Sequence, residues 1–200
     1  MCSGGCSRCI GVTLYPLVLI SIICNIVLFF PGWDVKYAKD GEITPEVRYM
    51  GGLVGGGLMV LIPAIYLNLT SQQGSGNRCE MFLSILFAAV GVAGGLYSFI
   101  VAVLGLNNGP FCMYGGIWTT PFKNSNSTYL ADYSCWADCT EPKNVVQFNI
   151  GLFFTLLVTS CLQVLLCAIQ MINGLCGCLF GACNKAVPLQ LTMLSSSIFS

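Results

Sequence analysis

The sequence contains no histidine and very little charge, and both absences exclude whole classes of function. Its 200 residues include only eight Lys or Arg and eight Asp or Glu, so 8% of the chain is charged and the formal net charge is zero. A soluble domain is roughly one-quarter charged. Without histidine, imidazole catalysis and imidazole metal ligation are excluded, and the balanced charge removes the electrostatic basis for nucleic-acid binding. Because 56% of the residues are apolar, the chain is expected to be a small integral membrane protein of one domain.

The stretches without charge predict four membrane-spanning helices. Charged residues are absent from 9–33, 49–77, 81–122 and 144–184, and a membrane helix needs about 20 mainly apolar residues. The third stretch is long enough for two helices, but the turn residues Leu-Asn-Asn-Gly-Pro after Gly105 limit it to one. Gly174 is expected to end the last helix. The predicted fold class is an all-α membrane protein, a four-transmembrane-helix bundle with spans at 10–30, 50–69, 81–106 and 149–172.

The first span has an alternative interpretation as a cleaved signal peptide. Its apolar core is longer than that of such a peptide, and no small-x-small cleavage site follows it. We therefore expect a retained helix. An even number of spans places both termini on one side of the membrane. The expected order is a cytosolic N-terminus (1–9), a small extracellular loop (31–49), a cytosolic link (70–80), a larger extracellular loop (107–148) and a cytosolic tail (173–200).

The distribution of positive charge does not decide which side is outside. Lysines and arginines are more numerous on the loop side: Lys36, Lys39, Arg48, Lys123 and Lys143, against Arg8, Arg78 and Lys185 on the side of the termini. The triplet Asn126-Ser127-Thr128 is an acceptor for N-glycosylation and favours an extracellular large loop. A second triplet at Asn68 lies at the end of a span, where the membrane shields it, and is interpreted as chance.

Thirteen cysteines are many for a chain of this length. Those on the side of the termini are candidate palmitoylation sites: Cys2, Cys6, Cys9, Cys79, Cys176, Cys178 and Cys183. Acylation would direct the protein laterally among lipids, since the helices already anchor it. The alternative is a metal cluster at the first three of these cysteines, but a closed zinc site requires four ligands. No metal and no cofactor is therefore predicted.

The large loop carries an odd number of cysteines: Cys112, Cys135 and Cys139. In an oxidising compartment two of them would pair and one would be left over. Spacing alone does not decide whether the pair is Cys112–Cys139 or includes Cys135.

Small residues recur at four-residue spacing in the second and third spans. The pairs are Gly51/Gly55, Gly52/Gly56 and Gly91/Gly95. Glycines at this spacing let membrane helices approach closely, so we expect these two helices to pack against each other. A homo-oligomer formed through one of these faces is the secondary alternative.

No catalytic constellation is present. The sequence has no Gly-x-Ser-x-Gly elbow and no phosphate-binding loop, and the loop carboxylates, such as Asp34, Asp40, Glu42 and Glu46, are expected to form a solvated face. The spans contain no charged residue, which argues against a proton-coupled transporter. The polar residues inside the spans are Asn25, Gln163 and Gln170. They are expected to be interhelical hydrogen-bonding residues, with a small-ligand pocket as the alternative.

Several segments together resemble the transmembrane-4 L-six family of tetraspanin-like proteins. They are the opening Met1-Cys2-Ser-Gly4-Gly-Cys6-Ser-Arg8-Cys9, then Phe29-Phe30-Pro31-Gly32, Met50-Gly51-Gly52-Leu-Val-Gly55-Gly56-Gly57, Gly109-Pro110-Phe-Cys112, Trp136-Ala-Asp-Cys139-Thr-Glu141-Pro142 and Cys167-Ala-Ile-Gln170. The resemblance covers nearly the whole chain. It implies four spans, cytosolic termini and a larger second extracellular loop, and it favours the Cys112–Cys139 pairing.

The resemblance also implies a function. Members of this family are similar to tetraspanins in acting as non-enzymatic membrane organisers, linked with integrins, receptors, adhesion, migration and proliferation. The expected partners are therefore lateral membrane proteins and membrane lipids, with no nucleic acid. The expected location is the plasma membrane, with endolysosomal membranes as the alternative. The rival hypothesis is a ligand-binding or transport-modulating membrane protein that uses a polar pocket among Asn25, Gln163 and Gln170.

Overall fold

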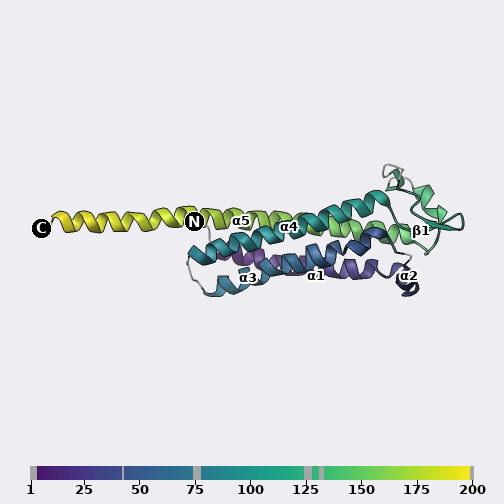
Figure 1. The fold of residues 1–200 in the computed structure, drawn as a ribbon, viewed down its shortest axis with the longest axis horizontal. Helices are drawn as coiled ribbons and strands as arrows, with labels where there is room; N and C mark the ends of the chain where they lie inside the picture. Colours follow the sequence, from purple (N-terminus) through teal and green to yellow (C-terminus); the bar gives the residue numbers. More distant parts are fainter. Residues whose placement is uncertain (1–3, 42, 74–77, 124–127, 131–132, 199–200) are drawn as a thin grey trace.

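Four long helical segments lie side by side and form one elongated bundle (Figure 1). The structure, a computed structural model, describes residues 4–41, 43–73, 78–123, 128–130 and 133–198. The segments are α1 (Gly4–Leu28), η3 (Gly51–Met59) continued by α3 (Val60–Gln73), α4 (Arg78–Asn108) and α5 (Val145–Ile198). Within the described residues, four stretches are long and apolar enough to cross a membrane: Cys6–Leu28, Pro45–Thr70, Met81–Asn108 and Val145–Cys178. The predicted four-helix membrane bundle is confirmed.

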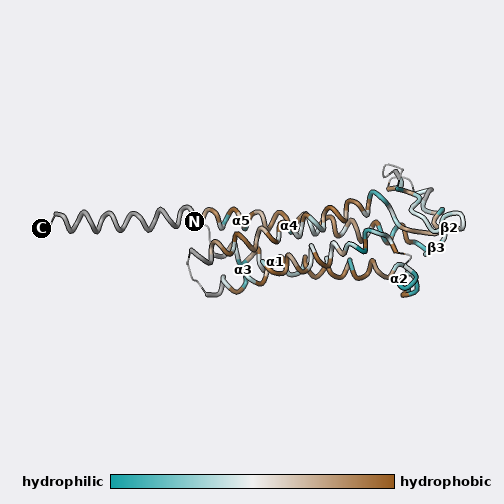
Figure 2. Tube along the Cα trace, viewed as in Figure 1, coloured by the Kyte–Doolittle hydropathy of each residue, from teal (hydrophilic) through white to brown (hydrophobic). Residues whose placement is uncertain are grey.

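The outer surface of the bundle is apolar along most of its length. Large side chains such as Leu19, Ile100 and Leu165 are exposed on three different helices. Figure 2 shows hydrophobic residues along α1, α4 and α5, and hydrophilic residues gathered at one end, near α2 (Lys36–Asp40) and β3 (Cys139–Glu141). A helix that is hydrophobic on all sides is typical of a membrane interior. The bilayer therefore covers the surface that water would otherwise face.

Helix α5 does not end at Gly174, where the sequence suggested a helix end. The helix continues to Ile198 and extends beyond the other helices (Figure 1). Gly174 is buried, and a Cβ atom at this position would lie 2.7 Å from Ile85 Cγ1 of α4. The glycine at this position allows close helix packing instead of terminating the helix.

The glycines of η3 contact more than one neighbouring helix. A Cβ atom at Gly55 would lie 2.5 Å from the carbonyl oxygen of Gly94 in α4, whereas one at Gly52 would lie 2.7 Å from Leu156 Cδ2 in α5 and from Ser21 O in α1. The expectation that these glycines serve a single helix pair is therefore too narrow. Because η3 is a π-helix, its small residues lie on several faces and bring three helices close to it.

In α4, two of the predicted glycines face α5. A Cβ atom at Gly91 would lie 2.7 Å from Cys167 Sγ, and one at Gly95 would lie 2.7 Å from Val164 Cγ2. Gly94, which the four-residue spacing did not select, makes the closest approach to η3. A Cβ atom at Gly94 would lie 2.7 Å from Gly55 O, so the backbones of Gly55 and Gly94 leave no room for a side chain between them.

Short elements gather at the end of the bundle opposite the termini (Figure 1). The small loop contains η1 (Pro31–Trp33), α2 (Lys36–Asp40) and η2 (Pro45–Tyr49). The large loop contains β1 (Cys112–Tyr114), β2 (Ile117–Thr119), η4 (Thr128–Leu130), η5 (Tyr133–Asp138) and β3 (Cys139–Glu141). The strands form an antiparallel sheet in the order β2-β1-β3. This sheet was not anticipated from the sequence.

Candidate partner-binding site at the loop end

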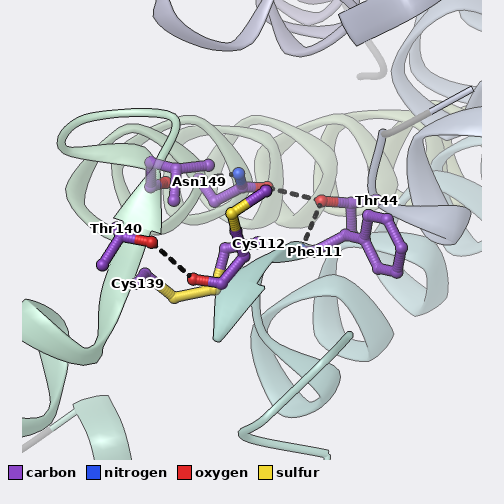
Figure 3. Close-up of a disulfide and its surroundings, with 8 residues drawn as sticks. Thr44, Phe111, Cys112, Cys139, Thr140 and Asn149 are labelled. Carbon is purple, nitrogen blue, oxygen red and sulfur yellow. Dashed lines mark hydrogen bonds between the residues drawn. A yellow bond between two sulfur atoms is a disulfide. The ribbon is translucent and has the colours of Figure 1, made fainter. Parts of the chain in front are cut away.

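The large loop has a small hydrophobic core of its own. A disulfide joins Cys112 in β1 to Cys139 in β3 (Figure 3), across a sequence separation of 27 residues. This is the pairing that the family resemblance implied. Phe122 and Tyr129 stack beside it, with ring centroids 4.6 Å apart. The cluster continues into Val145 and Val146 at the start of α5, so the loop core is joined directly to a spanning helix.

Tyr129 attaches this core to the end of α4. Its hydroxyl donates a hydrogen bond to the carbonyl oxygen of Leu106, and its own carbonyl oxygen accepts one from Trp136 Nε1 at 2.8 Å. Burial, and secondarily the charge of Glu46, raise the pKa of Tyr129 to about 12. The raised pKa keeps the donated proton on the tyrosine at a higher pH than an exposed tyrosine would allow.

Thr44 connects the small loop to the large loop and to α5. Its hydroxyl donates to Asn149 Oδ1 at 3.4 Å, and the same oxygen accepts a hydrogen bond from the Phe111 amide at 3.3 Å (Figure 3). The residue is buried. A single side chain thus holds three separate segments together where the loops meet the membrane bundle.

Glu46 corrects an expectation from the sequence. It was assigned to a solvated face, yet it is only 6% exposed. Its Oε1 accepts a hydrogen bond from Asn108 Nδ2 at 2.6 Å, and its Oε2 has no hydrogen-bond partner among the described residues. The assignment was wrong because the end of α4 and the folded large loop cover this part of the small loop. Asp34 and Asp40 are exposed, as expected, and Glu42 lies outside the described residues.

We use "loop end" for residues 29–50 and 107–144. The loop end carries exposed apolar side chains around the disulfide-tied core. Ile117 and Tyr133 are each 70% exposed, and Tyr114 is also exposed. A cavity of about 560 Å³ opens between η5 and the start of α5, lined in part by Tyr133, Trp136 and Lys143. Aromatic side chains such as these tyrosines are enriched at protein-contact surfaces.

The β1–β2 turn presents two of these side chains, Tyr114 and Ile117. Gly115 and Gly116 form its two central positions with φ of 58° and 86°. Positive φ at both positions is what a tight two-residue hairpin requires. The turn therefore projects Tyr114 and Ile117 at the edge of the sheet.

The candidate modification sites are only partly described. Cys6 and Cys9 are free and exposed, and Cys176 and Cys178 are free and half-buried. Cys2 and Asn126 lie outside the described residues, as do the side chains of Cys79, Cys135 and Cys183. Asn173 Nδ2 donates a weak hydrogen bond to Cys6 Sγ at 3.7 Å, so the first and fourth helices meet beside Cys6.

The three polar residues predicted inside the spans differ in their hydrogen-bond partners. Gln170 Nε2 donates to Ser84 Oγ at 3.0 Å, and Gln163 Nε2 donates to the carbonyl oxygen of Gly56 at 2.8 Å. Asn25 is buried, and its Oδ1 has no hydrogen-bond partner in the part of the chain that the structure describes. In the described chain, none of the three is hydrogen-bonded to another of them.

Four spans with a larger, disulfide-tied loop define the class: a multi-pass membrane protein. Over residues 1–184 the chain matches the family model described as L6 membrane protein, and it belongs to that tetraspanin-like family. It is 45% identical to Transmembrane 4 L6 family member 4 of Mus musculus, covering 92% of this chain and 95% of the relative. It is 42% identical to family member 1 of Homo sapiens, covering 92% and 96%. No solved structure matches the chain.

Proposed function

We propose that this protein is a non-enzymatic organiser of the membrane, whose loop end makes lateral contacts with neighbouring membrane proteins. The observation that carries the proposal is the exposure of Ile117 and Tyr133 on a loop fixed by the Cys112–Cys139 disulfide. A fixed surface loses little conformational entropy when it binds, so more of its contact energy contributes to affinity. The family resemblance favours adhesion receptors such as integrins, or signalling proteins, as the partners.

The proposed orientation has cytosolic termini and an extracellular loop end at the plasma membrane. The disulfide supports it, because disulfides persist on the oxidising side of a membrane. Glycosylation of Asn126 would follow from the same orientation. In this arrangement adhesion, migration or proliferation would change through the receptors that the loop end contacts.

Acylation is proposed at the opposite end of the bundle. Cys6 and Cys9 are exposed near the start of α1, where a thioester-linked chain would enter the adjacent lipid. Acyl-exchange mass spectrometry should find at least one of these cysteines modified. Unmodified thiols at Cys2, Cys6 and Cys9 together would remove this part of the proposal.

Proximity labelling in living cells tests the loop-end proposal. The variant Ile117→Ser/Tyr133→Ser removes two exposed apolar side chains without altering the buried core. The matched control is Cys161→Ser, because Cys161 is also exposed but lies on α5, outside the loop end. Losing two interface anchors should lower labelling of the true neighbours by about tenfold or more. A neighbour list that stays the same in the double variant would contradict the proposal.

A further inference from the structure

Polar side chains from several helices meet inside the bundle, away from both of its ends. Gln163 Nε2 donates to the Gly56 carbonyl oxygen at 2.8 Å and to Ser21 Oγ at 3.4 Å. Ser21 Oγ in turn donates to Thr159 Oγ1 at 3.2 Å. These bonds satisfy the amide donor of Gln163 and the hydroxyl proton of Ser21.

Two buried polar atoms of this cluster have no hydrogen-bond partner among the residues that the structure describes. They are Gln163 Oε1, an acceptor, and Ser98 Oγ, which carries a proton to donate. Gln163 is 0% exposed and Ser98 is 1% exposed. An unsatisfied polar group buried in a membrane costs more than it would in contact with water. Both atoms therefore require a hydrogen-bonding partner.

The two atoms lie close to the same glycine, Gly56. A Cβ atom at Gly56 would lie 3.1 Å from Gln163 Oε1, 3.1 Å from Ser98 Oγ and 3.1 Å from Ser21 Oγ. Three oxygens from α1, α4 and α5 thus surround one glycine of η3. The glycine keeps the space between them free of a side chain, and π-helical segments such as η3 frequently occur at functional sites.

We infer that this cradle binds one water molecule between Gln163 Oε1, Ser98 Oγ and Ser21 Oγ. The donors and acceptors match. The Ser98 hydroxyl donates to the water, and the water donates one proton to Gln163 Oε1 and the other to Ser21 Oγ. Buried waters typically make about three hydrogen bonds to otherwise unsatisfied groups. The water links α1, α4 and α5, and Gln163 also bonds to Gly56 of η3. All four spanning segments are therefore connected at one place.

A metal cation does not fit the same cradle. All three oxygens are neutral, and α1, α4 and α5 contribute them from sequence stretches that contain no charged residue. Burying an uncompensated charge there is strongly unfavourable. A cation also cannot accept the proton of Ser98, which would leave that donor unsatisfied.

The variant Ser98→Ala tests the inference by whether it lowers the Tm of the protein or not. If Ser98 donates to a bound water, removing its hydroxyl should lower the free energy of unfolding by about 1 kcal/mol. In a chain of this size that change lowers Tm by about 2–4 °C. If Ser98 is a buried hydroxyl without a partner, its removal should leave Tm unchanged or raise it, and that result would overturn the inference. Ser160→Ala is the matched control, because Ser160 is equally buried but bonds only to the Leu157 carbonyl oxygen of its own helix, at 3.0 Å.

A second measurement detects the water directly. The full chain, labelled with ¹⁵N-glutamine and placed in lipid nanodiscs, should show a nuclear Overhauser cross-peak between water and the Gln163 side-chain amide. The variant Gln163→Leu identifies that amide signal, and Ser98→Ala should weaken the cross-peak. Its absence from the unaltered protein, or a shift of the amide signal on titration with sodium chloride but not with choline chloride, would overturn the inference.

Discussion

The loop end and the membrane bundle maintain their folds by different means. In the loop end, a disulfide, stacked aromatic rings and buried hydrogen bonds hold short elements together. In the bundle, glycines bring the backbones of neighbouring helices together, as at Gly55 and Gly94. The difference follows from the surroundings. A short loop in water has too small a core to fold by burial alone, whereas lipid supplies no hydrophobic drive for helix association and makes close packing decisive.

The largest expected effect comes from removing the disulfide. Cys112→Ser should lower the free energy of unfolding of the loop end by about 3–4 kcal/mol, because the loop it closes regains its conformational entropy. Protease digestion should then cleave within 107–148, while far-UV circular dichroism reports unchanged helices. Cys161→Ser is the control, since Cys161 is free and exposed on α5. Loss of helix together with the loop would show that the two regions do not fold independently.

A glycine substitution should destabilise the helix bundle and leave the loop end folded. Gly55→Ala places a Cβ atom 2.5 Å from the Gly94 carbonyl oxygen, and overpacking of this kind costs about 1–3 kcal/mol. Thermal unfolding in detergent should show a lower Tm, with loop-end protease resistance preserved at lower temperature. Gly151→Ala should leave Tm unchanged or higher, because nothing lies within 4 Å of its added Cβ atom. Equal Tm values for the two variants would argue against glycine packing.

The smallest effect concerns alkaline pH at the loop end. The folded pKa of Tyr129, about 12, lies above its ordinary value of 10.0, so the folded state binds this proton more tightly than the unfolded state. The resulting stability is complete below pH 10 and is lost as the pH rises through about 12. Tyr129→Phe should remove this part of the alkaline destabilisation, measured as loop-end protease resistance against pH.

The variant Glu46→Gln measures how much the charge of Glu46 contributes to the raised pKa of Tyr129. Removing the carboxylate charge should lower the pKa of Tyr129 only part of the way towards 10, because burial is the larger cause. Difference absorbance of tyrosinate between this variant and its Tyr129→Phe counterpart measures the change. A pKa that does not move would show that Glu46 does not act on Tyr129.

The sequence predicts the membrane architecture well because lipid imposes a simple rule. Spanning helices must be long and uncharged, and the gaps between charges identify them. The Cys112–Cys139 pairing required the family resemblance, since spacing left Cys135 as an alternative. The burial of Glu46 was not predictable from its neighbours, because a carboxylate in a charged loop is covered only once the distant large loop has folded.

The close contacts within the bundle were harder to predict. Gly94 lies next to Gly95, and the four-residue spacing selected only the latter, because spacing does not say which helix each glycine will face. Ser21 and Ser98 are single hydroxyl residues in apolar stretches and carry no sequence signal. Their importance appears only when α1, α4 and α5 meet around Gly56.

Epitope accessibility on intact cells tests most directly the claim that the loop end faces outside. One tag at each terminus and a third inserted between Gly115 and Gly116, where the turn has open space around it, would be stained before and after permeabilisation. The account predicts that antibody reaches the inserted tag on intact cells and reaches the terminal tags only after permeabilisation. Terminal tags that stain on intact cells would contradict the proposed orientation. The proposed glycosylation, acylation and partner contacts depend on that orientation and would be contradicted too.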